Sequence, residues 1–317
     1  MGEKRICEGS FADAFVAPGV GRNARLDRIE ELFDWSRLAS ILKPLRSRYG
    51  SKGYPALSMF KSLLLQQWYG LSDPGLEEAL LEHLSFRRFC GFSLDDATPD
   101  ETTILRFRAV MAESGLAAKT FDEVNRQLES NGLVLKSGAL IDASLVAAPV
   151  AKPGGKSGAP SALDPEAAWG GEGGFHFGYK AHISIDQFSC LIRKAKLTPG
   201  NINESLEVDG LIVGDEKAVY ADKGYENKAR RRRLKALGVK DRIMHRSHKN
   251  QDGLPHWQQV RNKLITPIRA SVEKMFGTMK RSYGYDRVRY RGVERNANHL
   301  HLLCVAINMR RAVVMAP

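Results

Sequence analysis

The sequence predicts an α/β protein in which a mixed sheet flanked by helices follows an all-helical N-terminal region. Residues from about 25 to 133 repeat their apolar side chains at helical spacing, with short turns between the segments. After residue 133, strand-like and helix-like segments follow one another in the order β, β, β, α, β, α, β, α, which is typical of a mixed sheet. A hydrophobic content of 43% and a charged content of 26% are those of a globular protein. We therefore expect a helical domain over 1–133 and an α/β domain over 134–317.

The helical region contains segments that end at turn residues. The third begins with a capping box formed by Thr98 and Glu101, with Pro99 at the first helical position. Short helices joined by tight turns suit a helix-turn-helix DNA-binding module and a plain helical bundle equally well. The sequence leaves both roles open, together with dimerisation. The expected helices cover residues 57–70, 73–91, 98–115 and 117–130.

The C-terminal region begins with an apolar strand, "ALIDASLV", that carries one acid, Asp142. Two alternating segments then form an antiparallel pair that turns near Gln187, and the buried strand "AVYADKGY" ends at Asp222. The last helix is largely apolar, and we expect it beneath the sheet. Strands are expected over 139–146, 177–186, 190–198, 218–222 and 242–246, and helices over 205–214, 226–238, 268–281 and 296–315.

A Gly- and Pro-rich segment separates the first two expected strands. Residues 148–174 contain 7 Gly and 4 Pro in 27 positions. A connection of this length without secondary structure is unusual inside a compact domain and is normally functional or disordered. We expect a mobile flap that becomes ordered on a partner.

Positive charge is concentrated in the C-terminal third of the chain. Residues 226–317 contain 22 Lys and Arg against 6 Asp and Glu, whereas the whole chain carries a net charge of +12. Such asymmetry indicates a polyanionic partner, and a nucleic acid fits best because Lys and Arg that bind phosphates release condensed counterions. The alternative is a basic surface that is merely solvated. A membrane partner is not expected, because the basic segments lack long apolar faces with aromatic anchors. The N-terminus lacks the apolar segment of a signal peptide, which predicts a cytoplasmic protein.

The expected helix over 268–281 places two bases and one acid along a single edge. Arg269, Glu273 and Lys280 fall within about 40° of one another, directly beside the apolar stripe of the helix. The acid is therefore expected where the helix meets the rest of the protein. The simpler interpretation is a salt bridge between neighbouring turns, worth a few tenths of a kcal/mol.

The acids of the two apolar strands give a sharper hypothesis. A carboxylate within or at the end of a buried strand is costly unless it is paired or binds a metal. If the strands of Asp142 and Asp222 are neighbours and the helix of Glu273 packs across them, three like charges meet, and a cation between them is needed. Carboxylate oxygens suit Mg²⁺ or Mn²⁺, and two such ions about 4 Å apart can support phosphoryl transfer. Taken alone, Asp222 could equally be a turn residue.

These residues also carry a family resemblance. The segments "ALIDAS" and "YADKGY", together with the spacing of Arg269, Glu273 and Lys280, resemble the signature of DDE transposases from bacterial insertion sequences, with the IS-five group as the nearest match. The resemblance extends over most of the chain from about 50 to 310, and it implies an RNase H-like catalytic fold. It further implies that Asp142, Asp222 and Glu273 hold two Mg²⁺ ions, for which Mn²⁺ can substitute, and that Arg269 and Lys280 contact the phosphates beside the scissile bond.

The function implied by the resemblance is DNA transposition. The protein would bind double-stranded DNA at inverted-repeat ends and join them to target DNA, acting as a homo-oligomer, at least a dimer on DNA, in the bacterial cytoplasm at the nucleoid. Two alternatives stay open, a catalytically inactive DNA-binding derivative and a sequence-unspecific nuclease on the same fold.

Further basic residues are candidates for DNA contact. The run "KARRRRLK" covers every side of its helix, so part of it must be a solvated face. The segment "RSYGYDRVRYRG" mixes tyrosines with arginines, as nucleic-acid surfaces do, although some of those aromatics can belong to the core. The expected DNA-binding residues outside the acid-bearing helix edge are Lys223, Arg230, Arg231, Arg232, Arg233, Arg281, Arg287 and Arg289.

Overall fold

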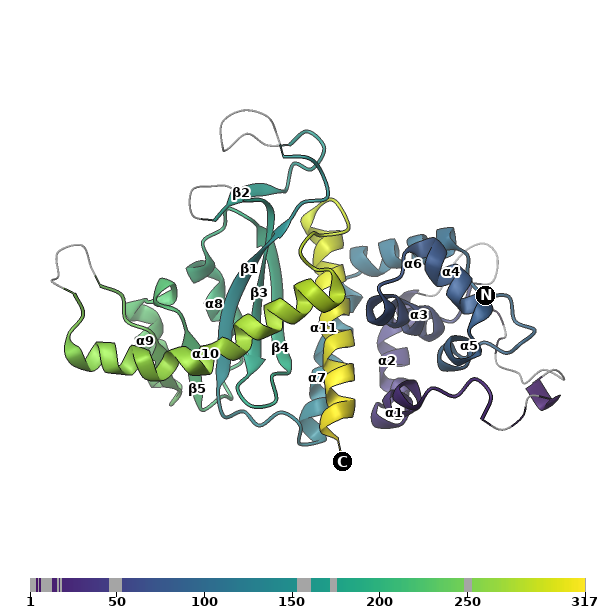
Figure 1. Cartoon of the computed structure of the whole chain (residues 1–317), viewed down its shortest axis with the longest axis horizontal. Helices are drawn as coiled ribbons and strands as arrows, with labels where there is room; N and C mark the ends of the chain where they lie inside the picture. The colour runs from purple at the N-terminus through teal and green to yellow at the C-terminus, as the bar shows by residue number, and fades with distance from the viewer. Residues whose placement is uncertain are drawn as a thin grey trace. The chain divides into compact units, whose positions relative to one another are not determined.

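The computed structural model describes residues 4, 6, 13–15, 17, 19–45, 53–152, 161–171, 176–247 and 253–316. The chain divides into two compact units, of which the first comprises Met1–Ser130 with His301–Pro317 and the second comprises Asn131–Leu300 (Figure 1). We expected the second part to run from 134 to the end of the chain, but the last residues group with the N-terminal helices.

The first unit is helical, as expected for the N-terminal region. Its central helix, α3, is buried along almost its whole length. The C-terminal segment belongs here because Trp68 Nε1 donates a hydrogen bond to the carbonyl oxygen of Ala306 at 2.8 Å, and Asn308 Nδ2 donates to Asn125 Oδ1 at 2.9 Å. The elements are η1 (Asp13–Phe15), α1 (Ala24–Leu32), α2 (Trp35–Leu42), η2 (Lys43–Leu45), α3 (Ala56–Tyr69), α4 (Asp73–Glu82), α5 (Leu84–Cys90), α6 (Glu101–Glu113) and α7 (Leu116–Ser130).

Two local expectations for this unit were wrong. The segment 73–91 is not one helix, because His83 adopts an extended conformation between α4 and α5. The capping box is also absent from the start of α6, where Asp100 is the N-cap and its side chain accepts a hydrogen bond from the Thr103 amide at 2.6 Å. An aspartate one residue before Glu101 therefore takes the role that we had assigned to Thr98.

The second unit is built around a mixed sheet. Strand β1 pairs antiparallel with β3 on one side and parallel with β5 on the other, and β5 pairs parallel with β6. Strands β2 and β4 both pair antiparallel with β3, along successive parts of it. This is the mixed sheet flanked by helices that the RNase H-like expectation calls for. The strands are β1 (Ala139–Ala147), β2 (Ala168–Gly170), β3 (His176–Asp186), β4 (Ile192–Pro199), β5 (Ala218–Ala221) and β6 (Lys240–Ile243).

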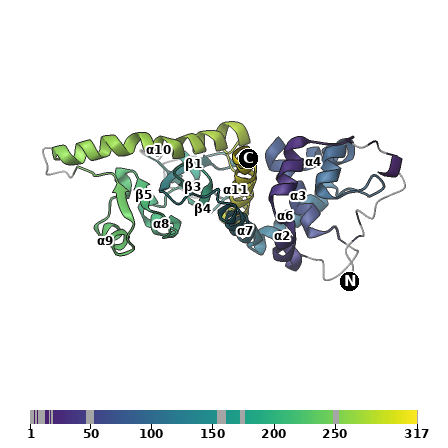
Figure 2. The same cartoon turned by 90° about the horizontal axis from the view of Figure 1, so that it is seen from below.

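Helices cover both faces of this sheet. Helix α10 lies across one face, where it packs on β1 and β5, and α8 and α9 lie on the other (Figure 2). A buried cluster that includes Ile141, Val208 and Leu234 joins the sheet to α8 and α9. Helix α10 is twice as long as we expected, since it begins at His256 and continues through Pro267. The helices are α8 (Glu204–Leu211), α9 (Lys228–Ala236), α10 (His256–Tyr283) and the first part of α11 (Val293–Met315), which continues into the first unit from His301. The 3-10 turn η4 (Lys223–Tyr225) follows β5.

Part of the expected flap is ordered. Residues 153–160 and 172–174 of the segment 148–174 lie outside the described residues. Of the rest, β2 joins the sheet, and the buried carboxylate of Asp164 accepts a hydrogen bond from the hydroxyl of Tyr179 at 2.7 Å. For residues 161–171 the expectation of a structureless flap was therefore wrong. No helix among the described residues has both the length and the apolar character that a bilayer span requires.

Candidate active site

The sheet places Asp142 and Asp222 side by side. In the parallel pair, Leu140 of β1 is the partner of Tyr220 of β5, and each aspartate lies two residues further along its own strand. Side chains two residues apart on a strand point to the same face. Asp222 comes directly after the last residue of β5, where the chain turns into η4, so the two carboxylates meet at the carboxyl end of that strand.

A single guanidinium group contacts both aspartates. Arg269 of α10 has its Nη2 atom 3.4 Å from Oδ2 of Asp142 and its Nη1 atom 3.5 Å from Oδ1 of Asp222. The arginine is 8% exposed, because the flanking Ile265 and Val272 hold this part of α10 against the sheet. These distances are long for hydrogen bonds, so the interaction is chiefly one of charge. Arg269 therefore already supplies positive charge at the point where two acids converge.

The electrostatic environment of Asp142 disfavours its ionisation. Burial raises the pKa of this carboxyl from its ordinary 3.8 to about 6, and the carboxylates of Glu204 and Asp222 act in the same direction. Arg269 and a hydrogen bond from the Ala143 amide at 2.9 Å oppose the rise. The protein thus does not fully offset the cost of burying the negative charge of Asp142. A bound cation would therefore stabilise the ionised form of this carboxylate strongly.

The sequence analysis did not identify three residues of this site. The hydroxyl of Tyr225 lies 3.0 Å from Oε2 of Glu204 and 3.5 Å from Oδ1 of Asp142. The ammonium group of Lys180 lies 3.3 Å from Oε1 of Glu204. Tyr225 was read only as part of the "YADKGY" motif, whereas Glu204 opens a helix, where acids are common. Lys180 is a charged residue in a buried stretch of β3, and that burial was the available signal.

The third expected acid, Glu273, is not gathered with the two aspartates. Its side chain is exposed on α10, one turn beyond Arg269. Within the described part of the chain, no three His, Cys, Asp or Glu side chains form a group that could hold a metal ion. In this structure the convergence is limited to the two aspartates, and the place of Glu273 beside them stays a prediction. The donor chemistry of Asp142 and Asp222 nevertheless fits a hard divalent cation, since their carboxylate oxygens already share the positive charge of Arg269.

Lys280 lies along the same edge of α10 as Arg269, as the helical spacing predicted. Its ammonium group donates a hydrogen bond to the carbonyl oxygen of Leu145 at 3.1 Å, three residues beyond Asp142 on β1. The contact ties α10 to β1 and places a second positive charge near the carboxyl end of that strand. A lysine has three donors, so two remain available for a phosphate.

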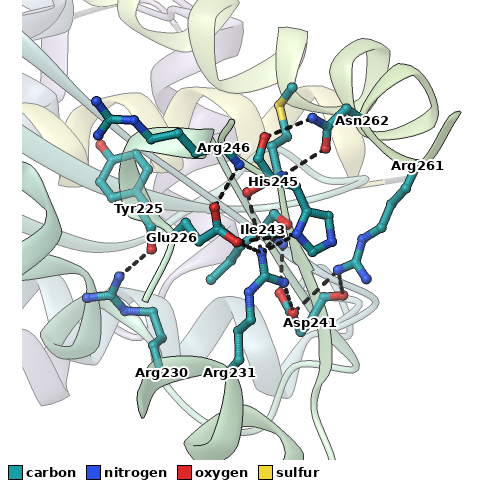
Figure 3. A network of polar contacts seen from close by, with 11 residues as sticks. Tyr225, Glu226, Arg230, Arg231, Asp241, Ile243, His245, Arg246, Arg261 and Asn262 are labelled. Atoms are coloured by element: carbon teal, nitrogen blue, oxygen red, sulfur yellow. Dashed lines mark hydrogen bonds and ion pairs between the residues drawn. The ribbon is translucent and has the colours of Figure 1, made fainter. Parts of the chain in front are cut away.

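Two arginines of the basic helix are occupied within the protein. Arg230 is buried and donates to the carbonyl oxygen of Tyr225 at 2.5 Å (Figure 3). It also pairs with Asp209 at 3.3 Å. Arg231 lies between Glu226, at 3.1 Å, and Asp241 (Figure 3). The expectation that Arg230 contacts DNA is corrected by its burial, because its guanidinium holds α9 to its surroundings. Arg231 has the same structural use.

The other basic candidates lie at the surface. Arg232 and Arg233 are exposed on α9, although Arg233 also approaches Asp209 at 3.4 Å. The remaining candidates are exposed and lie near an end of η4 or α10. They are Lys223, Arg281, Arg287 and Arg289. The structure brings none of these next to the paired aspartates by a described contact.

Comparison with known proteins agrees with the architecture. Residues 17–110 match the family described as "Transposase domain (DUF772)", and residues 135–309, more than half of the chain, match the family described as "Transposase DDE domain". The structure described as a cryo-EM structure of the piggyBac transposase synaptic complex with hairpin DNA is similar at a TM-score of 0.46 and 10% sequence identity, covering 92% of this chain and 75% of that chain. A likeness of this degree carries no argument about function. The family match does, and members of that family act with divalent metal ions. This chain belongs to the DDE transposases and is a DNA transposase.

Proposed function

We propose that this transposase binds inverted-repeat ends of double-stranded DNA as at least a dimer, and that it cleaves and joins DNA with two Mg²⁺ ions. The observation that carries the proposal is the pair of carboxylates, Asp142 and Asp222, which the parallel register of β1 and β5 places together beside Arg269. Two DNA ends need two active sites, which is the reason to expect a dimer on DNA.

The acidic residues of the site would bind the metal ions, and the basic residues would bind the DNA phosphates. Asp142 and Asp222 would hold the divalent ions, and Glu273 would join them. When bound, such ions lower the pKa of an attacking water or 3′-hydroxyl and stabilise the leaving oxygen. Arg269 and Lys280 would contact the phosphates beside the scissile bond, which would free the aspartates from the guanidinium that now lies between them. The exposed basic residues at Arg232, Arg233, Lys223, Arg281, Arg287 and Arg289 would hold the duplex on either side.

Plasmid cleavage tests the proposal. Supercoiled plasmid that carries the DNA flanking the gene, and plasmid that lacks it, would be incubated with the protein and Mg²⁺. We expect cleavage that depends on the ends and on Asp142, Asp222 and Glu273, tested as Asp142→Asn, Asp222→Asn and Glu273→Gln. Cleavage that ignores the ends would favour a nuclease, and no cleavage despite DNA binding would favour an inactive binder.

A matched control separates catalysis from the loss of a negative charge. Asp95→Asn makes the same chemical change at an exposed position of the helical unit. It should cleave as the unaltered protein does, whereas Asp142→Asn should keep its DNA affinity and lose cleavage by a factor of about 1,000 or more, as expected when a metal ligand is removed. Normal cleavage by Asp142→Asn would show that this residue is not in the active site.

A further inference from the structure

The hydroxyl group of Tyr225 lies between two carboxylates and can donate its proton to only one of them. Its oxygen is 3.0 Å from Oε2 of Glu204 and 3.5 Å from Oδ1 of Asp142. Hydrogen bonds between oxygens span about 2.5–3.0 Å. The hydroxyl group therefore donates its hydrogen bond to Glu204, which is the nearer carboxylate. The tyrosine oxygen lies beside Asp142 without donating to it.

Both carboxylate oxygens of Glu204 have separate partners. Oε2 accepts from Tyr225, and Oε1 lies 3.3 Å from the ammonium group of Lys180. Lys180 is itself buried and fixed, since it also donates to the carbonyl oxygen of Ile202 at 2.9 Å. Asn203, which caps α8, holds Glu204 at the first position of the helix. The orientation of the Glu204 carboxylate is thus set by its surroundings.

The remaining acceptor capacity of Oδ1 of Asp142 is small. Its Oδ1 atom already accepts a hydrogen bond from the Ala143 amide at 2.9 Å. A carboxylate oxygen has about two lone-pair sites, so one is left on this atom. A hydrogen bond from Tyr225 would occupy that site and would compete with a cation for it.

We propose that Glu204 and Tyr225 are positioning residues for Asp142: Glu204 accepts the hydrogen bond that the tyrosine hydroxyl donates and so keeps Oδ1 of Asp142 available to a divalent cation. The inference rests on the proposed function, because it assigns Asp142 to the metal site. It adds two residues that do not bind the cation themselves but fix the direction of the hydrogen bonds behind it. Residues of this kind commonly change metal affinity by about 10–100-fold.

The substitution Glu204→Gln tests the direction of these hydrogen bonds. Lys180 can only donate, so it will turn the amide oxygen of the glutamine toward itself and leave the amide nitrogen facing Tyr225. The nitrogen then donates to the tyrosine oxygen, and the hydroxyl proton must go to Asp142. We expect Mn²⁺ to bind about tenfold more weakly to this variant of the full chain, measured by electron paramagnetic resonance of the free ion.

The double variant gives the result that a merely structural role would not produce. Tyr225→Phe removes the competing donor, so Glu204→Gln combined with Tyr225→Phe should bind Mn²⁺ within about threefold of Tyr225→Phe alone. Glu207→Gln is the matched control, because it makes the same change one turn further along α8, where the carboxylate pairs with Lys196. It should bind Mn²⁺ as the unaltered protein does.

The outcomes separate this inference from the function on which it rests. Unchanged Mn²⁺ affinity in Glu204→Gln, or a tenfold loss that persists in the double variant, would overturn the positioning role while leaving the metal site in place. Equal Mn²⁺ binding by Asp142→Asn and the unaltered protein would instead reject Asp142 as a ligand, and the positioning role with it. Far-ultraviolet circular dichroism of each variant establishes that the fold is kept.

Discussion

Asp142 is held in the fold at some cost to stability, and that cost depends on pH. Burial raises its pKa to about 6, above the ordinary 3.8, so the folded protein binds this proton more tightly than the unfolded chain does. Stability from this group is therefore fully present below pH 4 and is lost as the pH rises through about 6. Buried carboxyl groups with a raised pKa are typical of functional sites.

The first prediction follows from that sign. Asp142→Asn should raise the free energy of unfolding by roughly 2–3 kcal/mol at pH 8 in the presence of a chelator, because a shift of about two pKa units is lost. This gain in the free energy of unfolding should disappear as the pH is lowered from 6 to 4. Urea denaturation at pH 4, 6 and 8 measures it, with Asp95→Asn as the control. A gain that is the same at all three pH values would contradict the role of burial.

Arg269 yields the second prediction, because it occupies the position of a cation between two acids. Without DNA, Arg269→Ala should bind Mn²⁺ about tenfold more tightly than the unaltered protein, since its guanidinium no longer competes for Asp142 and Asp222. Titration followed by electron paramagnetic resonance measures this, and Lys274→Ala, an exposed position on the same helix, is the control. Equal affinities for the two variants would show that the guanidinium does not compete.

At the scale of the element, α9 divides its arginines between two tasks. Arg230 and Arg231 face the protein and pair with Asp209, Asp241 and Glu226, whereas Arg232 is exposed. The helical spacing of "KARRRRLK" shows that the side chains point in all directions, but it does not show which direction meets acids from α8 and β6. The partition becomes visible only when those elements are placed.

The third prediction uses this partition. Arg230→Ala should lower the free energy of unfolding by about 3 kcal/mol, because it removes a buried side chain and leaves the carbonyl oxygens of Tyr225 and Ser205 without their hydrogen-bond donor. Arg232→Ala should leave stability within about 0.5 kcal/mol of the unaltered protein and should lower the salt dependence of DNA binding by about one counterion. Urea denaturation and fluorescence anisotropy at several salt concentrations measure the two effects. The reverse pattern would show that the buried arginine is the one that binds DNA.

The strands show what sequence can predict about the site and what it cannot. Asp142 and Asp222 were identified because a charge stands out in an apolar run. Glu204 was missed because an acid at the start of a helix is ordinary. The distance between Glu273 and the aspartates depends on how α10 lies across the sheet, and its helical spacing fixes only which residues share an edge. Periodicity therefore predicts faces, whereas contacts between elements need the tertiary structure.

At the scale of the whole molecule, the C-terminal segment determines how the units are composed. Most of α11 was expected beneath the sheet because of its apolar character, but the residues from His301 onward belong to the helical unit. The apolar character of a helix predicts that it is buried, but it does not predict which elements pack against it. Trp68 and Asn125 supply the specific hydrogen bonds that the sequence pattern could not indicate.

The fourth prediction concerns this segment. A chain that ends at Leu300 should lose amide hydrogen-exchange protection in α3 and α7, because those helices lose hydrogen-bond partners and buried contacts with residues 301–315. Protection in β1 and β3 should decline less, since those strands are paired within the other unit. Exchange measured by mass spectrometry compares the two sets. A greater loss in the strands would contradict the division of the chain.

The alternation of side-chain direction along β1 and β5 determines which insertions the chain can accept. Asp142 and Asp222 share a face because each lies two residues beyond a member of the register pair Leu140 and Tyr220. Adding one residue inside either strand would turn its carboxylate to the opposite side, while adding residues anywhere between 150 and 215 outside the strands would leave both where they are. The position of the two aspartates therefore does not depend on the length of the chain between their strands, but it does depend on the exact number of residues within each strand.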